Sequence, residues 1–275
     1  MGSTYRAPWR SLMHVAPLLA VLVAPSALAR PHVRRHFEPT DLELEAPGTA
    51  ELDFETGFVR GQDPWRLVAP DFELDLGFAK WLEIDVDGAY AVEGAPGKPF
   101  TFDHAAPDPL WPSCKVGVVD LVDDEAKRTY ALGAQLGPKL PTYSGGHGFG
   151  VEGLLLGGVT MGATTFSFNA GGFVDPAPAR NSPRPIGFES GVTWDQDLDT
   201  AGHYSLSTDL AGVVFASDDP AQLQVAFGPV VEVSSWLDLS LTGIYGILPG
   251  GDRYGALFGF SPHFGVWNPE RTAAQ

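Results

Sequence analysis

The chain has 275 residues, with 34 Asp and Glu against 17 Lys and Arg, so its formal net charge at pH 7 is −17. This acidic balance argues against nucleic acid as a partner, because neutralising phosphates requires clustered Lys and Arg. Hydrophobic residues make up 44% of the sequence, which is typical of a folded chain and excludes extensive disorder. The single cysteine, Cys114, excludes an intramolecular disulfide.

The N-terminal residues have the order of a secretory signal. Two arginines precede an apolar stretch at 15–24, and the small-residue triplet Ala27-Leu28-Ala29 follows it. The alternative is a membrane anchor, but the apolar stretch is short and Pro25 interrupts it. We therefore expect export and cleavage after Ala29, which removes two basic residues and brings the net charge to −19.

Polar and apolar residues alternate along much of the remaining sequence, which is the period of a β-strand with one polar face. The clearest stretches are 51–58, 71–78 and 82–87, in which Asp or Glu occupies most of the alternate positions. Gly and Pro recur between the apolar runs, as expected for many short strands. We predict strands near 49–60, 66–78, 82–94, 112–121, 128–140, 148–160, 164–174, 185–196, 203–216, 222–233, 237–248 and 254–267.

About twelve strands of this length predict an all-β fold, a transmembrane antiparallel up-and-down β-barrel. Each strand has the roughly 10 residues that a tilted strand needs to cross a bilayer. Closing the sheet leaves no exposed edge. We expect a signal peptide at 1–29, an N-terminal periplasmic segment or plug at 30–48, the barrel at 49–267 and a C-terminal tail at 268–275.

The connections between the predicted strands fall into two sets. If the first strand runs outward, the periplasmic turns lie near 79–81, 122–127, 161–163, 197–202 and 234–236, and the longest connections, 95–111 and 175–184, are both outer. Trp and Tyr gather at both sets of strand ends, as in the aromatic girdles of membrane barrels. Trp81 and Trp236 are examples at the periplasmic ends, and Trp65 and Trp111 at the outer ends.

The polar faces of the first three strands are acidic. If their apolar faces contact lipid, their carboxylates face the lumen, and later strands add further charged side chains to a polar interior. The predicted lumen-lining residues are Glu51, Asp53, Glu55, Asp71, Glu73, Asp75, Glu83, Asp85, Asp87, Lys115, Glu152, Glu189 and Asp209. Two interpretations remain open: the wall favours passage of cations, or it only satisfies the need of a barrel interior for polar groups.

Catalytic and metal-binding patterns are weak. Ser261 and His263 share one strand face, as an outer-membrane lipase would require, but no adjacent acid or Asn completes a triad. The histidines lack the paired spacing of a zinc site. We expect no enzyme activity, no metal site and no cofactor.

Four segments resemble a known family: 37–45, 68–75, 136–141 and 248–255, the last reading Leu-Pro-Gly-Gly-Asp-Arg-Tyr-Gly. They look like poorly characterised outer-membrane barrels related to the family named for the MetA pathway of phenol degradation, and the resemblance covers most of 37–267. It implies a barrel of the transporter or channel class, with no established catalytic residues. The chain departs from many such barrels by continuing past its last aromatic residue, Trp267.

We therefore expect a bacterial outer-membrane barrel that acts as a passive pore or transporter for small solutes. The expected partners are outer-membrane lipid, a small-molecule or ion solute and the barrel assembly machinery. The alternatives are a non-conducting structural or adhesion barrel, whose lumen side chains fill, and a soluble periplasmic β-sandwich that binds a ligand.

Overall fold

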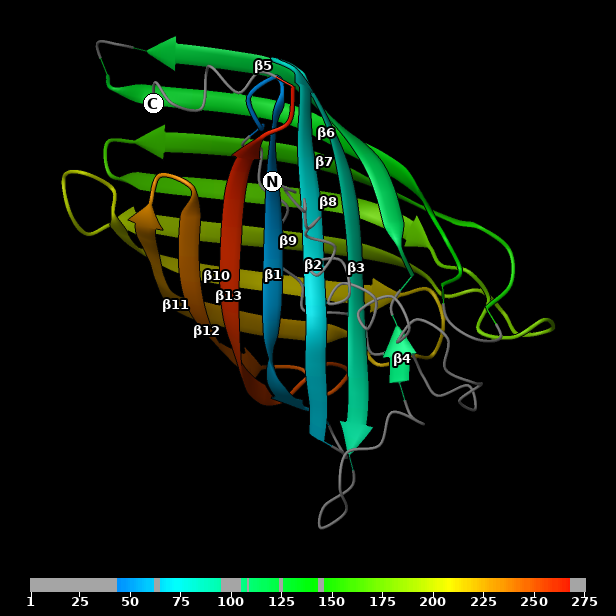
Figure 1. Cartoon of the computed structure of the whole chain (residues 1–275). Helices are drawn as coiled ribbons and strands as arrows, with labels where there is room; N and C mark the ends of the chain where they lie inside the picture. Colours follow the sequence, from blue (N-terminus) through cyan, green and yellow to red (C-terminus); the bar gives the residue numbers. More distant parts are fainter. Residues whose placement is uncertain are drawn as a thin grey trace, which may run out of the picture.

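The computed structural model describes residues 44–61, 65–94, 105–107, 109–123, 126–142 and 146–267. Antiparallel strands account for most of them (Figure 1). The strands are β1 (Thr49–Arg60), β2 (Trp65–Ala79), β3 (Leu82–Gly94), β4 (Ala105–Pro107), β5 (Trp111–Asp123), β6 (Arg128–Lys139), β7 (Gly150–Met161), β8 (Thr164–Val174), β9 (Ile186–Asp197), β10 (Tyr204–Phe215), β11 (Gln222–Ser234), β12 (Leu237–Gly246) and β13 (Tyr254–Gly265). In the described part of the chain, no helix is long and apolar enough to span a membrane.

The strands close into a barrel of twelve, which confirms the predicted fold class. Each long strand pairs with the next one along the chain, and β13 returns to pair with β1. Figure 1 shows β1, β2, β3 and β13 side by side in front, with β5 to β10 crossing behind them at a steep angle, as strongly tilted strands on opposite walls do.

The seam of the barrel lies between β3 and β5. Only the first half of β3 pairs with β5, from Leu82 opposite Val116 to Asp87 opposite Trp111. Farther along, Tyr90 to Val92 pair with the short β4, which stands outside the ring of twelve. The residues of β4 fall within the connection that the sequence predicts at 95–111. The structure therefore adds a short strand to the predicted set.

The strand connections define two ends of the barrel. At the turn end, residues 80–81, 162–163 and 235–236 join β2 to β3, β7 to β8 and β11 to β12. At the loop end, longer connections such as 175–185 join β8 to β9. The two predicted sets of connections thus lie at opposite ends. The predicted signal peptide, residues 30–43 of the N-terminal segment and the C-terminal tail lie outside the described residues.

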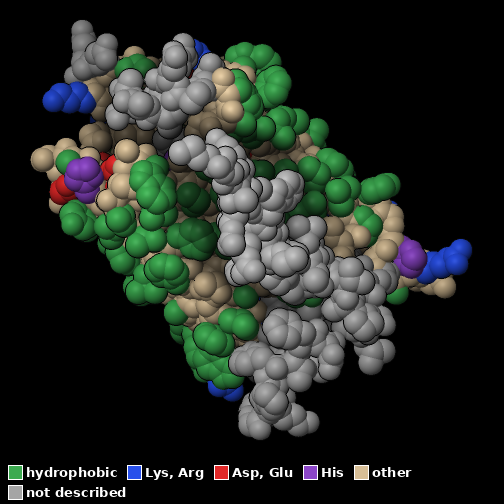
Figure 2. Space-filling model, viewed as in Figure 1, with side chains coloured by type: hydrophobic (Ala, Val, Ile, Leu, Met, Phe, Trp, Pro, Cys, Tyr) green, Lys and Arg blue, Asp and Glu red, His purple; other side chains and the backbone are tan. Residues whose placement is uncertain are grey.

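Large apolar side chains cover the outside of the barrel. On β7, Leu155 is 68% exposed, whereas Leu154 and Leu156 on either side point inward and are buried. Figure 2 shows hydrophobic side chains over much of the visible face, with the charged side chains in view toward its edges. A contiguous apolar surface of this extent is unfavourable in water and matches the hydrocarbon of a bilayer.

Candidate functional site

Nine carboxylates from β1, β2 and β3 line one inner wall, here called the acidic wall. Strand register sets them in cross-strand rows: Glu51–Asp75–Asp85, Asp53–Glu73–Asp87 and Glu55–Asp71, with Glu83 opposite Gly77. Because like charges directly opposite each other in a sheet repel, the rows cost stability unless counter-charges or hydrogen bonds offset them. The wall is therefore an arrangement that strand packing alone does not favour.

Strands β5 and β6 supply polar partners along one edge of this wall. Lys115 lies opposite Glu83 in the ladder, and its Nζ is 2.6 Å from Glu83 Oε1. Gln135 Nε2 donates to Asp85 Oδ2 over 2.7 Å and to Ser113 Oγ over 2.8 Å. These groups are almost fully buried, and a buried ion pair is costly to break from one side.

Strand β13 borders the opposite edge of the acidic wall with Ser261 and His263. Ser261 Oγ donates to Asp53 Oδ1. His263 Nε2 lies 3.3 Å from Glu51 Oε1 and 3.3 Å from Asp238 Oδ2. Acids thus do lie beside this pair, contrary to the interpretation from sequence alone, but the serine hydroxyl is bonded to a carboxylate and not to the imidazole.

Residues 44–46 cross the inner face of the barrel at the turn end. Glu45 N donates to Glu83 Oε2, and Gly48 N donates to Gly77 O over 2.8 Å. A Cβ on Gly77 would meet Ala46 O at 2.3 Å, so only glycine allows this close approach. The segment therefore covers the turn-end part of the acidic wall from the lumen side.

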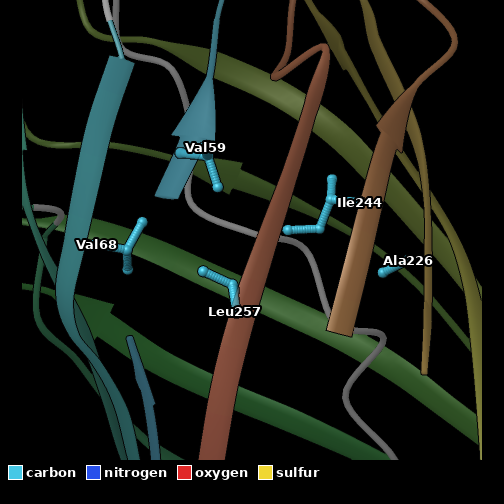
Figure 3. Packing of buried hydrophobic residues seen from close by; sticks show 5 residues of the cluster. All are labelled: Val59, Val68, Ala226, Ile244 and Leu257. Carbon is cyan, nitrogen blue, oxygen red and sulfur yellow. The ribbon is translucent and has the colours of Figure 1, made fainter. Parts of the chain in front are cut away.

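The inner face near the loop end is apolar. Val59, Val68, Ala226, Ile244 and Leu257 form a buried cluster, here called the apolar belt. Figure 3 shows these side chains pointing toward a common space inside the barrel from β1, β2, β11, β12 and β13. A Cβ on Gly255 would meet Val59 Cγ1 at 2.7 Å, so the glycine leaves room for the larger neighbour.

A second apolar cluster of Trp111, Leu154 and Leu156 comes from β5 and β7. Trp111 is 6% exposed and faces inward, with Lys139 Nζ 5.9 Å from its ring centroid. Its predicted place in an outer aromatic girdle is therefore wrong, whereas the exposed Trp81 and Trp236 lie at the turn end as expected. The prediction of a polar interior holds for the acidic wall but not for the apolar belt and this second cluster.

Ion pairs lie beyond the apolar belt at the loop end. Arg66 binds Asp252 of the β12–β13 connection. Lys139 binds Glu152, and its Nζ lies 3.3 Å from Asp175 Oδ1. The interior thus changes along its axis from carboxylates at the turn end, through apolar side chains, to paired charges at the loop end.

The structure places all thirteen predicted lumen-lining residues on the inner face of the barrel. Nine form the acidic wall, and Lys115 contacts it through Glu83. The other three are dispersed on the remaining wall: Glu152 pairs with Lys139, and Glu189 on β9 and Asp209 on β10 are buried away from the acidic wall. Ser113, Gln135 and Asp238 were not among the predicted site residues, and their contacts depend on strand register.

A closed, antiparallel, twelve-stranded barrel with an apolar outer face and charged inner wall has the fold of outer-membrane barrels. The structure is similar to an outer membrane channel from Pseudomonas putida F1, with a TM-score of 0.60 and 11% identity over 83% of this chain and 100% of that chain. It is also similar to the NanC porin, with a TM-score of 0.50 and 8% identity over 76% of this chain and 97% of that chain. No family model and no curated protein matches the sequence. At these identities the likeness is one of fold.

Proposed function

We propose that the protein is an outer-membrane channel that passes small solutes and favours cations over anions. The signal peptide would direct export and be cleaved after Ala29, and the family resemblance to barrels related to the MetA pathway of phenol degradation belongs to the same proposal. The observation that carries it is the acidic wall: nine carboxylates on three adjacent strands of a closed barrel. The similar structures, one an outer membrane channel and one a porin, support it.

The physical basis of the preference is electrostatic. Fixed carboxylates inside a barrel with low-dielectric walls raise the local concentration of cations and lower that of anions. Among the described residues, Lys115 and His263 bring positive groups to the wall through Glu83 and Glu51. The proposal involves passage along the wall and no catalytic step.

Conductance in a planar bilayer tests this proposal. Across a salt gradient, the wild type should show a reversal potential displaced toward cation permeation. Neutralising Asp53, Asp71, Glu73 and Asp85 as Asn or Gln should weaken the displacement while folding is kept. The control replaces Asp218 and Asp219 in the β10–β11 loop with Asn, which removes exposed charge outside the barrel wall. Equal or anion-biased permeation by the wild type would remove the role of the wall.

The proposed location in the outer membrane is tested separately from conductance. The protein should fractionate with the outer membrane, and unboiled and boiled samples should differ in gel mobility because a closed barrel resists detergent. Recovery in the soluble periplasm, with no mobility difference, would contradict the membrane barrel.

A second candidate function is a non-conducting structural barrel. The apolar belt favours it, because Val59 and Leu257 are at most 1% exposed and such side chains do not line a wide aqueous path. Residues 44–46, which cross the inner face at the turn end, also favour a non-conducting barrel. A folded, membrane-inserted protein without conductance would decide for this candidate.

A further inference from the structure

Three carboxylates from β2 and β3 converge at the turn end of the acidic wall. Asp75, Glu83 and Asp85 each have a carboxylate oxygen within 4.8 Å of the others. They are 7%, 1% and 0% exposed, respectively. Asp75 and Asp85 are direct partners in the β2–β3 ladder, so strand pairing itself holds the two carboxylates together.

The hydrogen bonds around this cluster leave specific oxygens unsatisfied. Asp85 Oδ2 accepts from Gln135 Nε2 and Ser113 Oγ, and Glu83 Oε2 accepts from Glu45 N. Glu83 Oε1 accepts no hydrogen bond among the described residues but forms an ion pair with Lys115 Nζ. Among the described residues, Asp75 Oδ1 and Asp85 Oδ1 are buried and accept no hydrogen bond. A buried carboxylate oxygen without a partner is costly, so these two atoms point to a missing ligand.

The charge of the cluster indicates that the missing ligand is a cation. Among the described residues, its three carboxylates face one ammonium group, that of Lys115, which balances one of the three negative charges when all are ionised. Asp75 also belongs to a neighbouring group with Asp53 and Glu73, which adds negative charge on the side away from Lys115. A single divalent cation would balance the cluster and engage both unsatisfied oxygens.

We propose that Asp75, Asp85 and Glu83 form a binding site for a divalent cation of the calcium class. The donors are carboxylate oxygens only, which suits hard cations, whereas zinc sites use His and Cys. Calcium accepts an irregular set of oxygen ligands, and magnesium demands a near-ideal octahedron that carboxylates fixed by strand register do not readily form. Asp75 and Asp85 supply the main ligands, since Glu83 already shares its oxygens with Lys115 and Glu45.

This site goes beyond the proposed channel and does not depend on conduction. A bound ion would crosslink β2 and β3 next to the seam, where β3 pairs with β5 over only half its length. It would also reinforce the contact of the Glu45 backbone with Glu83. The ion is therefore expected to act on barrel stability whether or not solutes pass.

Calorimetric titration of the folded mature protein tests the site. The protein is refolded in detergent, treated with a chelator, exchanged into chelator-free buffer and titrated with calcium chloride. The wild type should bind one ion with a Kd on the order of 10⁻⁴ M, and magnesium chloride should bind more weakly. Asp75→Asn should weaken calcium binding by about tenfold or more, because it removes a charged ligand but loses no hydrogen bond that the structure shows.

The matched control is Asp209→Asn, a buried inner-face aspartate on β10, which should keep the wild-type affinity. Calcium should also raise the unfolding midpoint of the wild type and of this control, but not that of Asp75→Asn. Absence of saturable binding by the folded wild type would overturn the site, as would equal losses in the two variants. If Asp75→Asn does not fold, Asp85→Asn replaces it and the wild-type titration still decides. None of these outcomes depends on conductance, so this test and the test of the channel fail separately.

Discussion

The acidic wall and the apolar belt occupy the same inner faces of β1 and β2, at opposite ends of those strands. At the turn end, the inward positions of β1 are Glu51, Asp53 and Glu55, and toward the loop end they are Gly57 and Val59. Strand periodicity fixes which residues face inward but not what chemistry the interior needs at each depth. The same inner face of β1 and β2 is therefore charged at the turn end and apolar toward the loop end.

The two regions have opposite effects on stability. Burying the side chains of the apolar belt stabilises the barrel by removing apolar surface from water. The acidic wall places carboxylates opposite one another in register, which destabilises it until partners offset the repulsion. An arrangement on three strands that costs stability is easier to understand if the wall acts on solutes or ions than if it only fills the interior.

The largest expected effect on stability comes from removing the ammonium group of Lys115, which contacts the acidic wall. Lys115→Met should lower the free energy of unfolding by about 3–5 kcal/mol, because it leaves Glu83 as a buried charge without its ammonium partner. Urea titration of the folded protein in detergent measures this. The exposed Lys80→Met is the control and should change little. The double variant Lys115→Met, Glu83→Gln should recover part of the loss, and no recovery would contradict a direct pairing effect.

The apolar belt should respond to the loss of packing. Leu257→Ala should cost about 2–5 kcal/mol in the same titration, because the side chain is buried inside the barrel and its removal leaves a cavity. Leu241→Ala on β12 is the matched control, since its side chain is 55% exposed on the outer face. Equal losses in the two variants would mean that the belt does not pack as a core.

The strands were predictable because alternation of polar and apolar residues needs no knowledge of the partner strand. The predicted strand 82–94 matches β3, and 164–174 matches β8. The apolar belt and the second apolar cluster were missed because alternation disappears where both faces are apolar, as in Phe58-Val59 of the belt and the run 154–156 of the second cluster. Such pairs of adjacent apolar residues in otherwise alternating strands were the signal that could have indicated them.

The site was predictable as a set of inward residues but not as a set of contacts. Which carboxylate lies opposite which depends on register, and a shift of one residue changes every pairing. The opposition of Asp75 and Asp85 and the pairing of Lys115 with Glu83 therefore required the structure. Trp111 was misassigned for a related reason: its place at a strand end was evident, but the direction of its side chain was not.

The smallest expected effect is a gain in the free energy of unfolding, whereas the two preceding variants lose it. It distinguishes repulsion between carboxylates from binding of a cation. In chelator, Asp75→Asn should raise the free energy of unfolding by about 0.5–1 kcal/mol, because Asp75 lies directly opposite both Glu51 and Asp85 and its charge repels them. Asp209→Asn, which has no carboxylate directly opposite, should show no such gain. In saturating calcium the order of wild type and Asp75→Asn should reverse, since only the wild type gains free energy from the bound ion. A gain that persists unchanged in calcium would leave the acidic wall as a region of repulsion without a bound cation.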